Sequence, residues 1–226
     1  MGAHGERRAG RRHSPDPAVG SNPAAWRDGK RYAWLLGLLV PLAPFVAWFG
    51  VEATHCGGFW FLSPVLVFGV LPLLDLAIGV DASNPPDAVR RWLEEDRYYR
   101  WCVYLYIPVQ YAGLVFACWQ WGGGGLTPVE GVGLAVTVGI VGGVGINTAH
   151  ELGHKRDRVE RRLSRVALAQ TGYGHFFVEH NRGHHARVAT PEDPASSRLG
   201  ESFWEFLPRA VCGGVASAWR LEAARL

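Results

Sequence analysis

Four long apolar runs, separated by charged or glycine-rich stretches, are the strongest constraint on the fold of this 226-residue chain. The runs cover residues 33–50, 59–80, 101–121 and 126–146. Each has roughly the 17–25 residues that cross a hydrocarbon core as an α-helix rising about 1.5 Å per residue. A bilayer offers no water to backbone groups, so such spans are helical. The sequence therefore predicts an all-α fold, a polytopic integral membrane helical bundle.

Prolines and tryptophans add detail to these four spans. Pro41 and Pro44 fall in the first run, and Pro64 and Pro72 in the second. Both helices are expected to kink there, because proline cannot donate a backbone hydrogen bond. Tryptophans stand at the borders of the runs, where indole rings favour the membrane interface. The mean hydropathy of the chain, +0.02, is low only because charged ends offset the apolar middle.

Basic residues predict the orientation of the chain in the membrane. Lysines and arginines stand before the first run, between the second and third, and after the fourth. The alternate connections, residues 51–58 and 122–125, contain neither. By the positive-inside rule, the N-terminus, the central loop and everything after Asn147 are cytoplasmic.

The chain is predicted to have four regions. Residues 1–30 mix Arg, Gly, Pro and Ser with little apolar material, and are expected to form a disordered, basic, cytoplasmic tail. Residues 31–146 hold the four transmembrane helices, and residues 147–200 form a cytoplasmic histidine-box segment. Residues 201–226 are predicted to be an interfacial amphipathic helix, since charged residues interrupt its apolar ones. The four cysteines show no Cys-x-x-Cys spacing, so they indicate neither a zinc knuckle nor a disulfide framework.

Six of the nine histidines fall in one segment directly after the fourth run. They are His150, His154, His175, His180, His184 and His185. On a helix, residues i and i+4 project from nearly one face, about 6 Å apart along the axis, so the first pair can bind one metal ion or two adjacent ones. The "HNRGHH" set repeats this step and adds i+5. Clustered neutral imidazoles favour a transition metal such as iron, zinc or copper over magnesium or calcium.

The stretch "HELGH", residues 150–154, also matches the signature of zinc proteases. In such a membrane zinc metalloprotease the two histidines would hold zinc, and Glu151 would be the general base. The motif is short, however, and a protease leaves the three histidines of "HNRGHH" unused. A non-catalytic metal-binding membrane protein is a further alternative.

Two stretches resemble the first two histidine boxes of the membrane alkane monooxygenases, also called alkane 1-monooxygenases or omega-hydroxylases. They are "NTAHELGHK" and "GYGHFFVEHNRGHHARVATPEDPASSRLGE". "LPLLDLAIGVDASNPP", residues 71–86, is also similar to the family's segment at the end of its second span. The broader fatty acid desaturase-hydroxylase superfamily shares only the looser H-x3-H and H-x2-HH pattern. Another membrane desaturase or hydroxylase therefore stays open as an alternative.

This resemblance implies a non-haem diiron oxidoreductase that hydroxylates the terminal methyl group of n-alkanes with dioxygen. Electrons would come from rubredoxin, itself reduced by rubredoxin reductase. The implied location is the bacterial cytoplasmic (inner) membrane, with the histidine boxes on the cytoplasmic side. The expected partners are thus the alkane, dioxygen, membrane lipid and the two redox proteins, and no nucleic acid.

The same resemblance assigns roles to individual residues. The two iron ions would be held by His150, His154, His180, His184 and His185. Glu151 is expected to act at the catalytic site by orienting a ligand histidine, and Glu179, Asp193 and His175 are candidates for similar support. The family continues with two more spans, a further histidine and a third histidine box. The chain is therefore expected to be truncated after residue 226 and inactive by itself.

Overall fold

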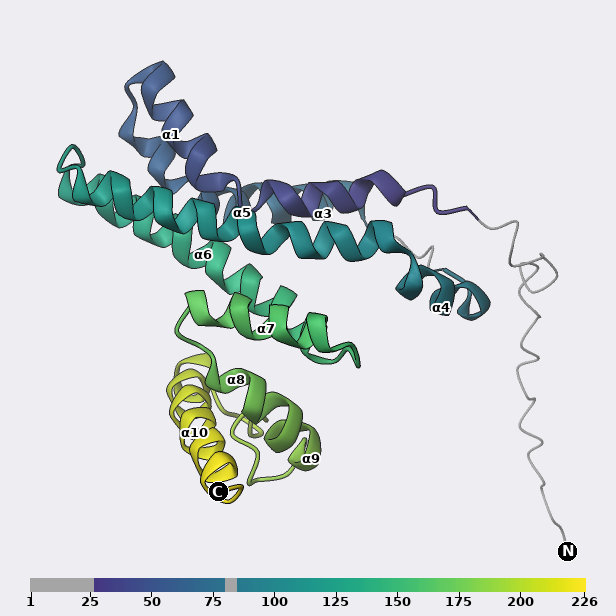
Figure 1. Ribbon diagram of the computed structural model, residues 1–226. Helices are drawn as coiled ribbons and strands as arrows, with labels where there is room; N and C mark the ends of the chain where they lie inside the picture. The colour runs from purple at the N-terminus through teal and green to yellow at the C-terminus, as the bar shows by residue number, and fades with distance from the viewer. Residues whose placement is uncertain (1–26, 80–84) are drawn as a thin grey trace, which may run out of the picture.

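The computed structural model describes residues 27–79 and 85–226, which form helices joined by short loops (Figure 1). Neither range contains a strand, which confirms the predicted all-α class. Three helices in these ranges are long and apolar enough to cross a membrane, namely Gly57–Ile78, Arg97–Gly122 and Pro128–Gly153. A bent pair of helices makes a fourth span if it crosses as one unit. Of the tail predicted over residues 1–30, residues 1–26 lie outside the described residues.

The first predicted span is bent. It consists of η3 (Arg31–Leu39, a 3-10 helix) and α1 (Ala43–Thr54), which meet at 63° with Pro41 in the break between them. Proline has no backbone N–H. The backbone N–H groups around the break instead donate to carbonyls three residues earlier, as in a 3-10 helix. The kink predicted for this run is confirmed, and α1 leaves η3 in a different direction (Figure 1).

The second span, Gly57–Ile78, is one helical segment with an irregular middle. It consists of η4 (Gly57–Phe61), α2 (Leu62–Val65), η5 (Leu66–Val70) and α3 (Leu71–Ile78). The backbone of η5 is a π-helix, in which the Leu71 N–H donates to the Leu66 carbonyl five residues earlier. Pro64 precedes η5 and Pro72 follows it. In this span the two prolines therefore accompany a local change from α-helix to π-helix.

The third and fourth spans are the longest helices and lie side by side (Figure 1). They are α5 (Arg97–Gly122), preceded by the short α4 (Asp87–Glu95), and α6 (Pro128–Gly153). Gly145 lets α6 approach α5 closely, because a Cβ atom at this position would overlap the side-chain amide of Gln110. Small residues at such contacts are the usual means of packing helices in a membrane.

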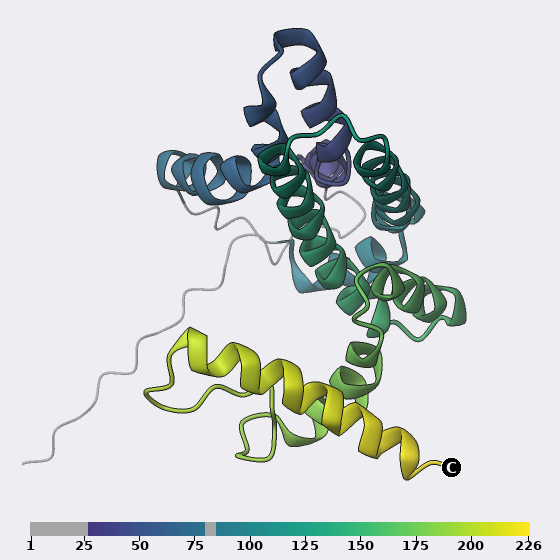
Figure 2. The same ribbon diagram turned by 90° about the vertical axis from the view of Figure 1, so that its left-hand side faces the viewer.

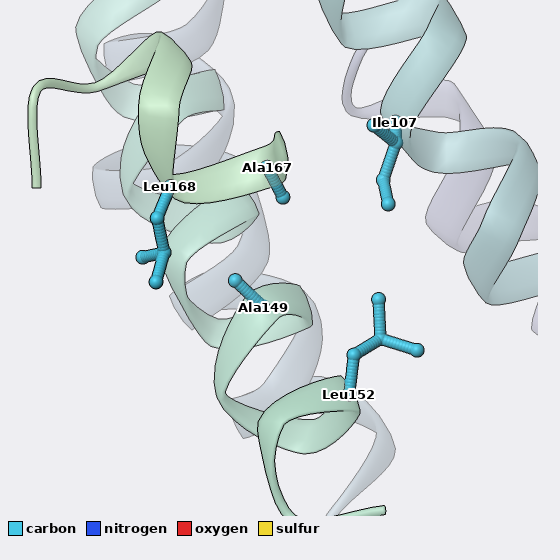
Figure 3. Close-up of a cluster of buried hydrophobic side chains, with 5 residues drawn as sticks. All are labelled: Ile107, Ala149, Leu152, Ala167 and Leu168. Carbon is cyan, nitrogen blue, oxygen red and sulfur yellow. The ribbon is translucent and has the colours of Figure 1, made fainter. Parts of the chain in front are cut away.

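α7 (Arg158–Gln170) packs across the end of α6 and also contacts α5. A cluster of buried apolar side chains joins the three helices (Figure 3), and it consists of Ile107, Ala149, Leu152, Ala167 and Leu168. The alanines keep the backbones close, and the Ser164 hydroxyl donates to the Ala149 carbonyl at 2.6 Å. This contact fixes the end of α6 that carries His150 and His154.

Replacing Leu168 with alanine is expected to loosen α7 by about 2–3 kcal/mol, because the side chain is fully buried and its loss leaves a cavity. Hydrogen exchange of the α7 amides and the thermal midpoint of the detergent-solubilised chain measure the effect. Val166→Ala on the exposed side of α7 is the matched control. Equal behaviour of the two variants would show that the cluster does not hold α7.

The C-terminal part of the described chain is a helical hairpin-like unit (Figure 2). α8 (His175–Val178), η6 (Glu179–His184) and α9 (His185–Arg187) follow one another without a break and pack on α10 (Phe203–Ala223). α10 is not among the helices apolar enough to cross a membrane. Its Trp204 and Trp219 are 79% and 78% exposed, as is typical of helices at a membrane interface. The interfacial position of α10 stays a prediction.

Candidate metal centre

Four imidazole rings converge where the end of α6 meets η6 and α9. Nε2 of His154 lies 3.0 Å from Nε2 of His150 and 3.1 Å from Nε2 of His180. Nε2 of His185 lies 3.1 Å from Nε2 of His180. Donor nitrogens of His150, His154 and His180 all lie within 4.8 Å of one another. The structure thus brings together four of the five predicted ligands.

η6 explains how the histidines of "HNRGHH" face one side. In an α-helix each residue turns by about 100°, so His185 would point about 140° away from His180. η6 is a π-helix, in which the His185 N–H donates to the His180 carbonyl five residues earlier. A π-helix turns by only about 80° per residue, which leaves His184 and His185 within roughly 50° of His180, one on either side. The π-helical turn is therefore what gathers the second set of imidazoles.

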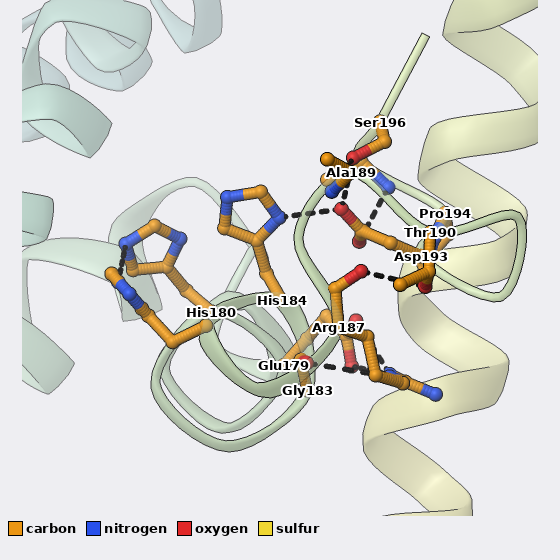
Figure 4. Close-up of polar contacts among 12 residues, drawn as sticks. Glu179, His180, Gly183, His184, Arg187, Ala189, Thr190, Asp193, Pro194 and Ser196 are labelled. Atoms are coloured by element: carbon orange, nitrogen blue, oxygen red, sulfur yellow. Dashed lines mark hydrogen bonds and ion pairs between the residues drawn. The ribbon is translucent and has the colours of Figure 1, made fainter. Parts of the chain in front are cut away.

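Asp193 orients His184, the fifth predicted ligand. Nδ1 of His184 lies 2.8 Å from Oδ2 of Asp193 (Figure 4), so the nitrogen that remains for a metal is Nε2. The His184 ring also stacks on the His180 ring, with centroids 5.3 Å apart. A carboxylate on the far nitrogen of an imidazole is the usual support of a metal-binding histidine. The geometry therefore suits the supporting role predicted for Asp193.

The surroundings of Asp193 keep its carboxylate ionised. Asp193 is buried, and burial alone would raise its pKa. Hydrogen bonds from the Ser196 hydroxyl, the Ala195 N–H and the His184 ring outweigh this effect and lower the pKa of Asp193 below its usual value. An anionic acceptor is thus available to His184 at neutral pH.

Asp193→Asn is expected to weaken metal binding by about 10–100-fold, because an amide no longer fixes the tautomer and orientation of His184. Titration of the purified chain with Co(II), followed by its visible absorption, measures the affinity. Glu192→Gln changes the charge of the exposed neighbouring residue and is the control. Unchanged affinity in Asp193→Asn would mean that His184 does not bind the metal.

Glu179, also predicted to support a histidine, makes a different contact. Its buried carboxylate pairs with the Arg187 guanidinium at 3.2 Å. The same guanidinium donates to the Ser217 hydroxyl at 2.6 Å and to the Gly183 carbonyl at 3.3 Å. Figure 4 shows Glu179, Gly183 and Arg187 on the side of this turn away from the His184 ring. Glu179 and Arg187 therefore connect η6 to α10.

His175 begins α8, five residues before His180, and its supporting role stays a prediction. Its ring contacts that of Tyr173, with centroids 4.4 Å apart, and burial lowers the pKa of His175. Within the described ranges its buried Nε2 has no hydrogen-bond partner. Phe176, which the sequence analysis did not single out, stacks on His180 with centroids 4.9 Å apart. An aromatic residue four positions before a histidine on a helix is the signal that predicts such a contact.

The protonation state of the histidines suits metal binding. Loss of solvation on burial, together with the neighbouring imidazoles, lowers the pKa of His180 to about 4. The same causes lower the pKa of His154 below its usual value. Both rings are therefore uncharged at neutral pH, which is the form that binds a metal ion.

The contacts among the four Nε2 atoms also fit a metal ion better than a hydrogen-bonded chain. A neutral imidazole nitrogen carries either one N–H or one lone pair. Three contacts of 3.0–3.1 Å link four nitrogens in a row, and no choice of tautomers gives each contact a proton of its own. A metal ion would instead use the lone pairs of His150, His154 and His180 together, since their donor nitrogens all lie within 4.8 Å of one another. The donor set is one that transition metals prefer.

Glu151, the predicted catalytic residue, lies outside the group of converging donor nitrogens. It lines a cavity together with Lys155, and the group of close metal-binding donors in the described ranges does not include it. In an α-helix each residue is turned by about 100° from the residue before it. Glu151 is therefore turned by about this angle from His150. A catalytic role for Glu151 stays a prediction.

Glu151→Gln is expected to retain metal affinity within about twofold, because the carboxylate lies outside the donor set. Metal titration of the purified chain tests this, and His150→Gln at the adjacent position is the contrasting variant. A protease with Glu151 as its base would instead show metal-dependent peptide cleavage that disappears in Glu151→Gln. That result would show that Glu151 takes part in peptide hydrolysis, and it would overturn our interpretation of the site.

Comparison with known proteins agrees with this architecture. Residues 127–226 match the family model described as fatty acid desaturase. The alkane 1-monooxygenase of Pseudomonas putida is 45% identical over 199 residues, which are 88% of this chain and 50% of that protein. Alkane 1-monooxygenase 1 of Alcanivorax borkumensis is 42% identical over 93% of this chain and 52% of its own length. The alkane 1-monooxygenase of Acinetobacter baylyi is 41% identical over 88% of this chain and 50% of its own length.

The chain thus spans about half the length of the curated relatives it matches. The matched half includes the residues that form the histidine cluster, which lie within the family match. Residues 127–226 are thus similar to the fatty acid desaturase family, and the chain is similar to about half of the length of alkane 1-monooxygenases.

Proposed function

We propose that this chain supplies the membrane helices and five metal ligands of an enzyme that hydroxylates the terminal methyl group of n-alkanes with dioxygen. The observation that carries the proposal is the convergence of four imidazoles, from two segments 26 residues apart, at the end of an apolar helix. The similarity to alkane 1-monooxygenases supports the choice of reaction. The protease alternative gains no support, because "HNRGHH" contributes histidines to the same cluster as "HELGH".

The metal in this proposal is a pair of iron ions. The ligands would be His150, His154, His180, His184 and His185, together with groups from the part of the relatives that this chain does not match. Bound iron would supply the activation of dioxygen and the cleavage of the terminal C–H bond.

The residues of the chain itself would bind the metal, orient its ligands and shield them from water. His154 and His180 offer neutral nitrogens at physiological pH, and Asp193 holds the His184 ring by its Nδ1. The ring of Phe176 covers one face of His180 and keeps water from it. α6 is an apolar helix that ends at the cluster, so an alkane dissolved in the bilayer can reach the metal without crossing water.

The proposed orientation has the site at the cytoplasmic face of a bacterial inner membrane. Basic residues follow the span that ends at His154, and the positive-inside rule supports this orientation. A rubredoxin reduced by its reductase would deliver electrons there, and the exposed arginines of α7 are the complementary surface for an acidic carrier.

The test is a fusion of this chain to the half of the Pseudomonas putida alkane 1-monooxygenase that it does not match. The fusion, supplied with rubredoxin, reductase and NADH, is expected to convert octane to 1-octanol, and to lose this activity in His180→Ala and His184→Ala. Metal analysis should find iron in the unmodified fusion. A fusion that is inserted and iron-loaded but forms no alcohol from octane or longer alkanes would refute the proposed reaction.

A further inference from the structure

Asp193 lies in a turn that its own hydrogen bonds hold together. The buried carboxylate accepts from the Ser196 hydroxyl at 2.5 Å and from the Ala195 N–H at 3.0 Å. The Ser196 hydroxyl oxygen also accepts from the Ala189 N–H at 2.9 Å. Outside the turn, the carboxylate contacts Nδ1 of His184 (Figure 4). Because the turn is closed in this way, the direction of the carboxylate follows the position of the whole turn.

Arg209 attaches this turn to α10. Its guanidinium donates to the Pro194 carbonyl at 3.2 Å and to the Ser196 carbonyl at 2.9 Å. It also donates to both carboxylate oxygens of Glu201, each at 2.6 Å, and these bonds are the largest cause of the low pKa of Glu201, about 2. A guanidinium is planar and holds its donors in a fixed geometry, so these contacts also fix its orientation. Arg209 therefore holds the two carbonyls on either side of Ala195 at a set place on the helix.

Gly213 brings the same turn close to the α10 backbone. It follows Arg209 by four residues and so lies on the same face of the helix. A Cβ atom at Gly213 would lie 2.7 Å from Cβ of Pro194, and the closed ring of proline leaves that atom no rotation by which to move aside. At the adjacent Gly214, the nearest described side-chain atom would be 4.0 Å away, which is ordinary contact. The absence of a side chain at Gly213 therefore lets Pro194, the neighbour of Asp193, rest on α10.

α10 thus supports both members of the pair formed by His184 and Asp193. Arg187 ties the η6 turn that carries the imidazole to α10, and Arg209 ties the turn that carries the carboxylate to the same helix. We propose that Arg209 and Gly213 act as positioning residues of the metal centre, by holding the Asp193 carboxylate within reach of the imidazole. The proposal rests on metal binding by His184, which is part of the proposed function, and not on the hydroxylation of alkanes.

The experiment compares Gly213→Ala with Gly214→Ala in the purified 226-residue chain, titrated with Co(II) in detergent and followed by visible absorption. Both changes add one methyl group to α10 and favour the helix. We expect Gly213→Ala to lower the Co(II) affinity about 10-fold, as the loss of a supporting residue does, and Arg209→Met to have a similar effect. Gly214→Ala should change the affinity less than about twofold, because its methyl group meets no close atom among the described residues. Circular dichroism checks that the helix content is equal.

A second pair of titrations separates positioning from a general loosening of α10. In the Asp193→Asn background, Gly213→Ala is expected to change the Co(II) affinity less than about twofold, because two residues that act through one group do not add their effects. Equal affinities of the two glycine variants, or a loss from Gly213→Ala that persists in the Asp193→Asn background, would overturn the proposal. If Asp193→Asn alone leaves the affinity unchanged, His184 does not bind the metal, and the proposed ligand set fails together with this proposal.

Discussion

His180→Ala is expected to lower the metal affinity of the chain by more than about 100-fold, beyond the 10–100-fold that loss of a supporting residue costs. His180 is the ring that links the two histidine segments, since its Nε2 lies 3.1 Å from Nε2 of both His154 and His185. Its removal takes away one of the three donor nitrogens that lie within 4.8 Å of one another. Iron per chain, measured after desalting, reports the loss.

His55→Ala is the matched control for His180→Ala. His55 is exposed and ends α1 in the left-handed conformation, far in sequence from the cluster. It should leave the iron content unchanged. Full iron retention in His180→Ala would mean that metal binds elsewhere. Circular dichroism of both variants checks that helix content is the same, so that a loss of iron is a loss of ligands.

Arg187→Ala is expected to destabilise the packing of η6 on α10 by about 3–4 kcal/mol, because it leaves the buried carboxylate of Glu179 without its cation. The Ser217 hydroxyl loses its partner in the same change. Hydrogen exchange of the α10 amides and the thermal midpoint in detergent measure the effect. We also expect weaker metal binding, since η6 carries His180 and His184.

A double variant separates charge burial from packing. Glu179→Met/Arg187→Met removes both charges at similar volume, and its stability is expected to lie within about 1 kcal/mol of the parent. If the double variant is as unstable as Arg187→Ala, the ion pair is not what holds η6 to α10. Arg182→Ala, which breaks an exposed pair with Glu222, should cost less than about 1 kcal/mol and is the surface control.

The spans and the histidine cluster were predictable from the sequence for different reasons. An apolar run of about 20 residues specifies a membrane helix almost independently of its neighbours, as α5 and α6 illustrate. The i, i+4 spacing of His150 and His154 specifies one helix face without reference to tertiary structure. The size of the bend at Pro41 was not predictable, because proline removes a hydrogen bond but the packing around it determines the angle.

The partners of the acidic residues were also beyond sequence analysis. Glu179 and Asp193 both lie near histidines in the sequence, yet only Asp193 contacts an imidazole. The loop from residue 188 to residue 202 folds back and brings Asp193 to His184, and that path depends on contacts with α10. Arg209 makes such contacts, donating to the carbonyls of Pro194 and Ser196.

The π-helical turn of η6 relates two histidine spacings to one another. A π-helical turn is equivalent to a single residue inserted into an α-helix, with the extra residue absorbed by the i to i−5 hydrogen bond at His185. Deleting one residue from "HNRGHH" would give H-x2-HH, whose i, i+3 and i+4 positions share one face of an ordinary α-helix. A one-residue deletion in this segment can therefore keep the imidazoles on one face only if the π-helical turn becomes an α-helical one at the same time.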